Sequence, residues 1–440
     1  MQQLFNFDNL AILSITLILF ISIIVGKYSK KYLQTDKNRN IFLILIYLIA
    51  ISLIITFSTD NIIIIGLFWL ISNLLLVLLM IHKPQWKQAK SSGLIALKNF
   101  LIGSLSLIFA LIILYLQSKS YKISEIINHN NIDKVALFSS CCLILIAALS
   151  QSALYPFHSW IISSLNSPTP ASALMHAGLV NGGGIILARF SPLFFKIPII
   201  LDLLFIIAII SILIGTIWKL IQSNVKAMLA CSTMSQMGFM VAQCSMGLFP
   251  AAIAHLFWHG MFKSYLFLSS PVIWQEKRFN LSYLPCKISF ILSLLCGICG
   301  AAIFAKINHI EITKWQTDIV LLVICFIAIT QLALTIIGQN ILKKFIPAFV
   351  LSSFASLIYA SSVNFIEKLM PSYLYNPQNL NLYHIMAMII FFVMWLLCLL
   401  LKGSNKIDRS FLNKYYVKFL NSSQPRQETI TSNRNQYRYK

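Results

Sequence analysis

Residues 167–184 read Ser-Pro-Thr-Pro-Ala-Ser-Ala-Leu-Met-His-Ala-Gly-Leu-Val-Asn-Gly-Gly-Gly, and they decide what kind of fold the chain can adopt. The stretch overlaps an apolar run at 170–189, yet it places polar groups and glycines in the middle of that run. Such residues loosen a helix at membrane depth and are tolerated where they face protein or a water-filled cavity. The sequence therefore predicts a discontinuous helix near the membrane midplane. The residues expected to shape this break are Pro170, Asn181, Gly182, Gly183 and Gly184.

The composition of the whole chain is that of an integral membrane protein. Of its 440 residues 58% are hydrophobic and 10% are charged, and the mean hydropathy is +0.81. Soluble domains carry about 25% charged residues, and disordered chains are poor in apolar ones. Both of these classes are therefore excluded.

A membrane-spanning helix needs about 20 mostly apolar residues, and thirteen runs meet that requirement. They lie at roughly 9–26, 41–58, 61–82, 94–116, 135–155, 170–189, 197–221, 226–246, 250–272, 287–306, 318–338, 345–365 and 383–402. We therefore expect an all-α, polytopic transmembrane bundle over residues 1–402, followed by a basic cytoplasmic tail at 403–440.

The basic residues set the expected orientation. Lys and Arg number 34 against 12 Asp and Glu, a formal net charge of +22. With the N-terminus outside, the inward loops and tail hold about three times as many Lys and Arg as the outward loops, as the positive-inside rule requires. We expect a cytoplasmic C-terminus whose tail lies near anionic lipid head groups. Because the charge follows membrane topology, nucleic acid is not an expected partner.

Ionisable side chains inside a membrane are costly and therefore mark functional sites. None of the twelve carboxylates lies in mid-span, whereas His255, His259 and Lys263 recur every four residues within one span. This spacing puts all three on one helix face, and imidazole exchanges protons near neutral pH. Three interpretations are open for this row: a proton relay, structural hydrogen bonding, or a metal site. The pair of histidines lacks an HExxH glutamate and a third ligand nearby, so no metal is expected.

Three further residues join the candidates for an ion relay. His176 precedes the glycine-rich break, and Lys226 begins the span that follows the seventh, where it could instead snorkel to the interface. His158 lies nearer a span end and is a weaker candidate. The nine cysteines, including Cys296 and Cys299, lie mostly in apolar runs and are expected to be buried small hydrophobic residues.

Three motifs carry a resemblance to a known family. The runs 152–160 and 167–177, then 225–239, then 255–268 resemble, in this order, the signatures of the proton-conducting antiporter-like membrane subunits. Such subunits occur in respiratory complex I and in multisubunit Na⁺/H⁺ antiporters. The resemblance is concentrated in a signature core at 150–275. It implies that His176, Lys226, His255, His259 and Lys263 form an ion relay.

The run from His176 to Gly184 resembles one branch of this family, the DabB subunits of two-component bacterial inorganic carbon pumps. The resemblance implies a multi-pass subunit of the bacterial inner membrane that conducts H⁺ or Na⁺ and drives a large cytoplasmic zinc protein, DabA. That partner would hydrate CO₂ to bicarbonate. The chain itself would be no enzyme and would hold no cofactor, because the zinc belongs to the partner.

The sequence departs from the family at two positions. Leu70 stands where the family keeps a mid-membrane glutamate, and Gln151 stands where it keeps a lysine. Lys306 matches a third position at which the family has a lysine. The departures leave alternatives open: a proton-pumping subunit of NADH:quinone oxidoreductase or of a Na⁺/H⁺ antiporter, and a structural membrane anchor without an ion path.

Overall fold

The computed structural model describes residues 5–129, 131–270, 286–311, 313–338, 341–401 and 409–430. This part of the chain is built of helices, joined by short loops and isolated β-bridges, which confirms the all-α class. The chain divides into two compact units. Unit one comprises Met1–Cys244, His255–Gln275 and Lys414–Lys440, and unit two comprises Ser245–Ala254 and Glu276–Asn413.

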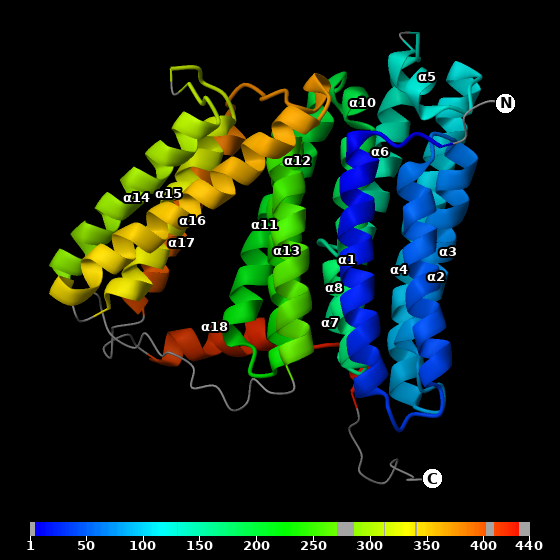
Figure 1. Cartoon of the computed structure of the whole chain (residues 1–440), viewed down its shortest axis with the longest axis horizontal. Coiled ribbons are helices and arrows are strands. Elements are labelled where there is room, and N and C mark those ends of the chain that lie inside the picture. Colours follow the sequence, from blue (N-terminus) through cyan, green and yellow to red (C-terminus); the bar gives the residue numbers. More distant parts are fainter. Residues whose placement is uncertain are drawn as a thin grey trace. The chain divides into compact units, whose positions relative to one another are not determined.

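Unit one contains the N-terminal helices and the discontinuous helix. Its elements are α1 (Asn9–Tyr32), α2 (Arg39–Ser58), α3 (Ile62–Met80), α4 (Lys87–Ser118), α5 (Ile123–Asn128), α6 (Lys134–Gln151), α7 (Ser159–Ile162), α8 (Thr169–Ala177), η1 (Leu179–Asn181), α9 (Gly182–Arg189), α10 (Ser191–Phe195), α11 (Pro198–Ile221), most of α12 (Val225–Ser245), α13 (Phe249–Ser269) from His255 onward, and η4 (Gln427–Thr429). Helix α1 packs against α2, α2 against α3, and α3 against α4, and Figure 1 shows these four helices alongside one another.

Several of these helices begin at side chains that cap them. Asp8 accepts a hydrogen bond from the backbone N–H of Ala11 at 2.8 Å, and Asn61 accepts one from Ile63 at 2.9 Å. Capping of this kind satisfies N–H groups that have no partner inside the helix. In a membrane this matters more than in water, because an unpaired backbone group has few other partners there.

Unit two is a smaller bundle. Its elements are α14 (Lys287–Ile307), α15 (Asp318–Ile337), α16 (Ile341–Leu369), η3 (Ser372–Leu374) and α17 (Leu382–Leu401). Helices α14, α15 and α16 pack against one another in pairs. Small residues permit this contact: a Cβ on Gly300 would lie 2.8 Å from Ile329, and the hydroxyl of Ser356 donates to the carbonyl of Gly300 at 2.6 Å.

A helical segment occupies each of the thirteen predicted spans. Among the described residues, eleven segments are long and apolar enough to cross a membrane. The other two predicted spans are α12 and α13, which have 21 residues each and are therefore about 31 Å long. Both helices are long enough to cross a membrane. Their polar residues lower the mean hydropathy, which is why they are not among the eleven apolar segments. These two helices carry most of the candidate ion-relay residues.

The predicted discontinuous helix is confirmed, although its interruption lies slightly earlier than the glycine run. Helix α8 ends at Ala177, the 3₁₀ turn η1 follows, and Gly182–Gly184 already form the start of α9. Pro170 lies in the first turn of α8, where a missing N–H costs nothing. Every residue from 169 to 188 is buried, so protein surrounds the irregular backbone on all sides within unit one.

The predicted tail at 403–440 is described only in part, because 402–408 and 431–440 lie outside the described residues. The rest contains α18 (Arg409–Ser422) and η4. Its end is attached to unit one: Gln222 donates to the Ser423 hydroxyl at 2.6 Å, and Trp218 donates to Ser422 at 3.1 Å.

The glycine run makes a specific prediction about packing. A Cβ on Gly183 would lie 2.2 Å from the Ser152 hydroxyl and 2.5 Å from the backbone oxygen of Ala148, and backbone cannot move aside cheaply. We expect Gly183→Ala to destabilise the protein by about 1–3 kcal/mol, as overpacking does. Thermal unfolding in detergent would measure the loss.

Gly66→Ala is the matched control for this substitution. Its new methyl group would meet only the flexible side chains of Ile108 at 3.3 Å and Leu111 at 3.7 Å. The melting temperature of the Gly66 variant should therefore stay close to that of the wild type. Equal effects at both glycines would contradict the close contact between α6 and α9.

Candidate functional site

The centre of unit one holds a row of basic side chains on one face of α13. His255, His259 and Lys263 follow one another at four-residue intervals, and the rings of the two histidines lie 5.9 Å apart. His259 is 5% exposed and Lys263 is 1% exposed. Phe267 continues the face by another turn, and the ring of His176 stacks on it at 4.2 Å. The structure thus brings His176 of α8 to the row that the sequence predicted on α13.

Several nitrogens of this row have no protein partner. Within the described part of the chain, both ring nitrogens of His259 and Nε2 of His255 are buried without a hydrogen bond. In the same part of the chain, the amide oxygen and nitrogen of Gln243 on α12 are also buried without a hydrogen bond. Buried polar groups are normally paired with protein or with ordered water. Unpaired imidazole nitrogens can accept or donate protons, as a relay requires.

A hydrogen-bonded path connects His176 with Lys263. The ammonium of Lys263 donates to the backbone oxygen of Leu229 at 3.1 Å, and the hydroxyl of Thr233 donates to the same oxygen at 3.0 Å. His176 Nδ1 lies 3.0 Å from that hydroxyl. In this arrangement Thr233 accepts from Nδ1–H, since its own proton is engaged. One hydroxyl and one carbonyl therefore separate the imidazole from the ammonium group.

The basic groups influence one another without acidic compensation. His259 interacts electrostatically with Lys263, His255 and His176, and His176 also interacts with Lys226. Among the residues that the structure describes, none of these groups forms an ion pair with a carboxylate. Positive charges on neighbouring members of the row repel one another. A proton on one member therefore makes its neighbours poorer acceptors.

Lys226 lies at the start of α12, between two pockets that open at the same end of unit one. A pocket of about 430 Å³ and one of about 210 Å³ both have Tyr32 and Lys226 in their walls. The lysine ammonium donates to the backbone oxygen of Ser167 at 2.9 Å. By the predicted topology these pockets face the cytoplasm, so Lys226 stands where an ion would enter or leave the row.

A carboxylate that the sequence did not single out lines the smaller pocket. Asp36 accepts hydrogen bonds from His82 at 3.1 Å and from the backbone N–H of Asn38 at 2.9 Å. Partial burial alone would raise the pKa of Asp36, but these bonds and the charge of Lys83 lower it. The carboxylate is therefore ionised at neutral pH. Lys83 lies 3.9 Å from the carboxylate, so the wall of this pocket carries charges of both signs.

The two departures from the family pattern have structural counterparts. Gln151 is 2% exposed, and its amide donates to the backbone oxygen of Leu179 in η1 at 3.3 Å. A neutral amide thus satisfies a carbonyl of the interrupted helix. Leu70 is half-buried, while its neighbour Trp69 is buried and packs against Gly182. Neither position supplies a charge to the row.

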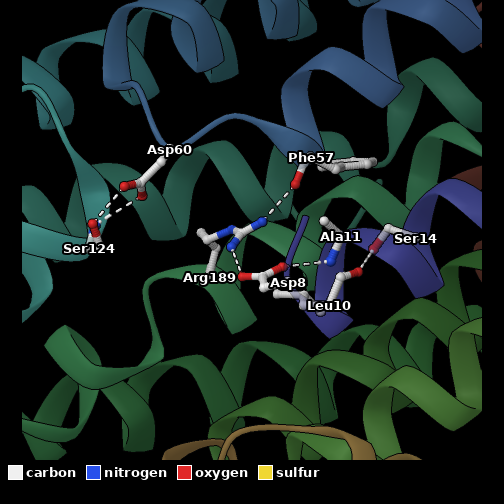
Figure 2. Close-up of polar contacts among 8 residues, drawn as sticks. All are labelled: Asp8, Leu10, Ala11, Ser14, Phe57, Asp60, Ser124 and Arg189. Carbon is white, nitrogen blue, oxygen red and sulfur yellow. Dashed lines mark hydrogen bonds and ion pairs between the residues drawn. The ribbon is translucent and has the colours of Figure 1, made fainter. Parts of the chain in front are cut away.

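An ion pair fixes the far end of the discontinuous helix (Figure 2). Arg189, the last residue of α9, pairs with Asp8, which caps α1. The second terminal nitrogen of Arg189 donates to the backbone oxygen of Phe57 near the end of α2 at 2.6 Å. The same view shows Asp60, which accepts from the hydroxyl of Ser124 at 2.6 Å and so attaches α5. The sequence analysis predicted no role for Arg189. The signal that could have found it is a basic residue at the end of the helix that begins with three glycines.

The two weaker candidates lie in other surroundings. His158 is half-buried between the rings of Tyr155 at 5.6 Å and Trp218 at 5.2 Å. Burial and the charge of Arg426 lower its pKa to about 4, so it is neutral at pH 7. Lys306 belongs to unit two and is exposed in the last turn of α14. In the described part of the chain, neither residue has a hydrogen bond or a ring contact with the row.

Comparisons with known proteins agree with this architecture. The sequence model of a family described as "NADH:quinone oxidoreductase/Mrp antiporter, TM" matches residues 59–284, just over half of the chain. Among solved structures, a chain of the Mrp complex from Dietzia sp. DQ12-45-1b resembles this one with a TM-score of 0.62 at 20% identity. The match covers 93% of the present chain and 52% of the Mrp chain, and it concerns the fold.

Curated relatives confirm the expected resemblance to DabB subunits. A "probable inorganic carbon transporter subunit DabB" of Bacillus subtilis is 34% identical over 302 residues, covering 67% of this chain and 60% of the relative. DabB1 of Halothiobacillus neapolitanus is 31% identical and covers 59% and 47% respectively. Subunit 5 of the chloroplastic NAD(P)H-quinone oxidoreductase of Carpenteria californica is 30% identical, covering 70% and 41%. The chain thus spans about half the length of these curated relatives.

The bridging hydroxyl of Thr233 yields a test of the row. Thr233→Val keeps the shape but removes the link between His176 and the carbonyl of Leu229. The lost hydrogen bond is worth about 1 kcal/mol, so we expect proton flux to fall by about fivefold. Flux into proteoliposomes, followed with a pH-sensitive dye, would measure it. Thr233→Ser should retain the wild-type rate, and an unchanged rate in the valine variant would exclude this path.

The Arg189–Asp8 pair predicts a loss of stability when one partner is removed. Its side chains are 11% and 24% exposed, between the extremes of buried and surface pairs. We expect Arg189→Ala to cost about 1–3 kcal/mol, an intermediate value. Thermal unfolding in detergent would show the loss, and Glu125→Gln, in an exposed pair with Lys122, should leave the midpoint unchanged. A similar small shift in both variants would refute an anchoring role.

Proposed function

Because the chain belongs to the NADH:quinone oxidoreductase/Mrp antiporter family of membrane subunits, we propose that it is the ion-conducting subunit of an inorganic carbon transporter. It carries protons, or Na⁺, down their gradient through unit one and passes the energy to a partner. The observation that carries this proposal is the row in which buried His176, His259 and Lys263 and half-buried His255 lie beside the interrupted helix.

The chemistry of the row favours proton transfer as the transported charge. Imidazole and amine nitrogens bind protons, and the Thr233 hydroxyl can exchange a proton with the imidazole of His176 that it contacts. A purely structural anchor has no need for four desolvated basic groups, which are costly in a membrane. The pockets beside Lys226 and the carboxylate of Asp36 give the row a charged mouth at the end predicted to face the cytoplasm.

Carbon as the transported substrate is supported by the DabB names of three relatives and by the run from His176 to Gly184. By that resemblance the partner is DabA, a large cytoplasmic zinc protein that hydrates CO₂ with a zinc-bound water. The chain would then be a subunit without catalysis of its own in the bacterial inner membrane. Its N-terminus would lie outside and its C-terminus in the cytoplasm, next to the partner.

A respiratory or antiporter role is the second candidate. The likeness to a subunit of an NAD(P)H-quinone oxidoreductase and the fold shared with an Mrp chain favour it. Leu70 and Gln151 count against it, because they remove the glutamate and the lysine on which pumping in that family depends. Purification of the chain from its native membrane separates the two. A co-purifying soluble zinc protein supports the carbon transporter, whereas flavin and iron–sulfur subunits, or several small membrane subunits, point to the alternative.

The two histidines on α13 provide the genetic test of the proposed function. In a host that lacks carbonic anhydrase, the chain and its partner should restore growth in air. We expect His255→Ala and His259→Ala each to abolish this rescue, because each interrupts the row at a desolvated position. Co-purification of the partner with each variant would establish that assembly is intact.

His129→Ala serves as the control for a histidine lost elsewhere. This residue is half-buried in the loop after α5, outside the predicted spans. Rescue should persist in this variant. Full rescue by both row variants would overturn the relay and would favour a structural anchor.

A further inference from the structure

Unit two contains a small pocket in which oxygen-bearing side chains gather within an apolar wall. Asn308 follows α14, Asp318 begins α15, Glu367 lies in the last turn of α16, and Tyr375 follows η3. The wall is formed by apolar residues that include Phe304 and Leu321. The polar groups thus come from the end of α14, the start of α15 and the end of α16, which meet at this pocket. By the predicted topology this end of unit two faces away from the cytoplasm.

Two carboxylates lie together in this pocket. Asp318 is 7% exposed, and the phenol of Tyr375 donates to its Oδ2 at 3.2 Å. Glu367 is half-buried and interacts electrostatically with Asp318. Burial and the two carboxylates raise the pKa of Tyr375, so its phenol stays protonated and continues to donate. The second oxygen of Asp318 and both oxygens of Glu367 remain as acceptors.

An amide oxygen completes the set of acceptors. Asn308 is 7% exposed, and its Nδ2 donates to the backbone oxygen of Phe304 at 3.1 Å. This bond fixes the orientation of the amide, because a carbonyl can accept only from the nitrogen. Within the described part of the chain, Asn308 Oδ1 is buried without a donor. Asn308 lines the same pocket as the two carboxylates, and a buried acceptor of this kind calls for a cation or a donor.

Among the described residues, neither carboxylate of this pocket forms an ion pair with a basic side chain. Glu367 is neighboured by Lys368 and interacts electrostatically with it and with His309. These neighbours offset part of the charge of Glu367, whereas among the described residues Asp318 accepts a side-chain hydrogen bond only from the neutral phenol of Tyr375. Burying a charge is costly unless an opposite charge is near.

We propose that this pocket binds a small monovalent cation, Na⁺, through the carboxylates of Asp318 and Glu367 and the amide oxygen of Asn308. All three groups would bind the cation through oxygen atoms, which are the ligands that hard cations prefer. The free volume is about 10 Å³, roughly the space needed by one water molecule or one dehydrated ion. Mg²⁺ usually keeps several waters and needs more room. No group of three or more His, Cys, Asp or Glu side chains able to hold a metal occurs among the described residues, so a transition metal is not indicated here.

The site is separate from the basic row of the proposed function. Its residues belong to unit two, and none of them takes part in the path through His176 and Lys263. Cation binding can therefore be measured on the purified chain whether or not the carbon proposal holds. Failure of one proposal leaves the other open to its own test.

Equilibrium binding of ²²Na⁺ to the purified full chain in detergent tests the site, with choline keeping the ionic strength constant. We expect saturable binding of one Na⁺ and a rise of the melting temperature with Na⁺ but not with choline. Asp318→Asn and Asn308→Leu should each weaken Na⁺ binding by about tenfold or more, as loss of a metal-site contact does. The leucine variant keeps both carboxylates and so tests the amide oxygen by itself.

Glu311→Gln is the matched control, because Glu311 is an exposed acidic residue of the same unit that pairs with Lys314 at 3.0 Å. It should bind Na⁺ as the wild type does. A melting temperature in choline close to that of the wild type would establish that each variant is folded. The proposal is overturned if the wild type shows no Na⁺-specific binding, if Asp318→Asn binds with unchanged affinity, or if Ca²⁺ or Mg²⁺ displaces Na⁺ at much lower concentrations.

Discussion

A polar group at membrane depth has to find its hydrogen-bond partners inside the protein, and this requirement organises unit one. The interrupted helix exposes carbonyls that a regular helix would use, and buried side chains of other elements satisfy them. The amide of Gln151 donates a hydrogen bond to the carbonyl of Leu179, and the hydroxyl of Ser152 donates one to the carbonyl of Val180. The ammonium of Lys263 is held in the same way by a carbonyl of α12. Glycine is needed where these elements approach most closely, because a side chain would occupy the place of the partner.

The two units solve the problem of buried charge in opposite ways. Unit one gathers four bases in one row, which forms no ion pair with a carboxylate among the described residues, so the row suits the binding and release of protons. Unit two gathers acceptors at one end of its helices, where oxygen atoms surround a space for a single small ion. A row of nitrogen-bearing side chains in unit one and a pocket of oxygen-bearing side chains in unit two are consistent with a protein that responds to two different ions.

Much of this could be predicted from the sequence, because membrane burial leaves a strong signal. The thirteen spans followed from hydropathy, and the row on α13 followed from four-residue spacing. The meeting of His176 with Phe267, and the carbonyl shared by Thr233 and Lys263, depend on how α8, α12 and α13 pack, which periodicity does not encode. For a related reason, the sequence did not predict the pocket formed by Asn308, Asp318 and Glu367. Each lies near a span end, where an isolated polar residue looks solvated until the fold brings three such ends together.

The lack of acidic partners around the row, within the described part of the chain, has a kinetic consequence. With no counter-charge nearby, a second proton entering the row meets the full repulsion of the first across a poorly polarisable interior. If the row conducts protons as proposed, it holds one excess proton at a time, and each must leave before the next is accepted. Current through such a path saturates as the proton concentration rises. A modest, nearly constant flow of this kind suits a device that supplies energy to a slower partner better than one that equilibrates a gradient.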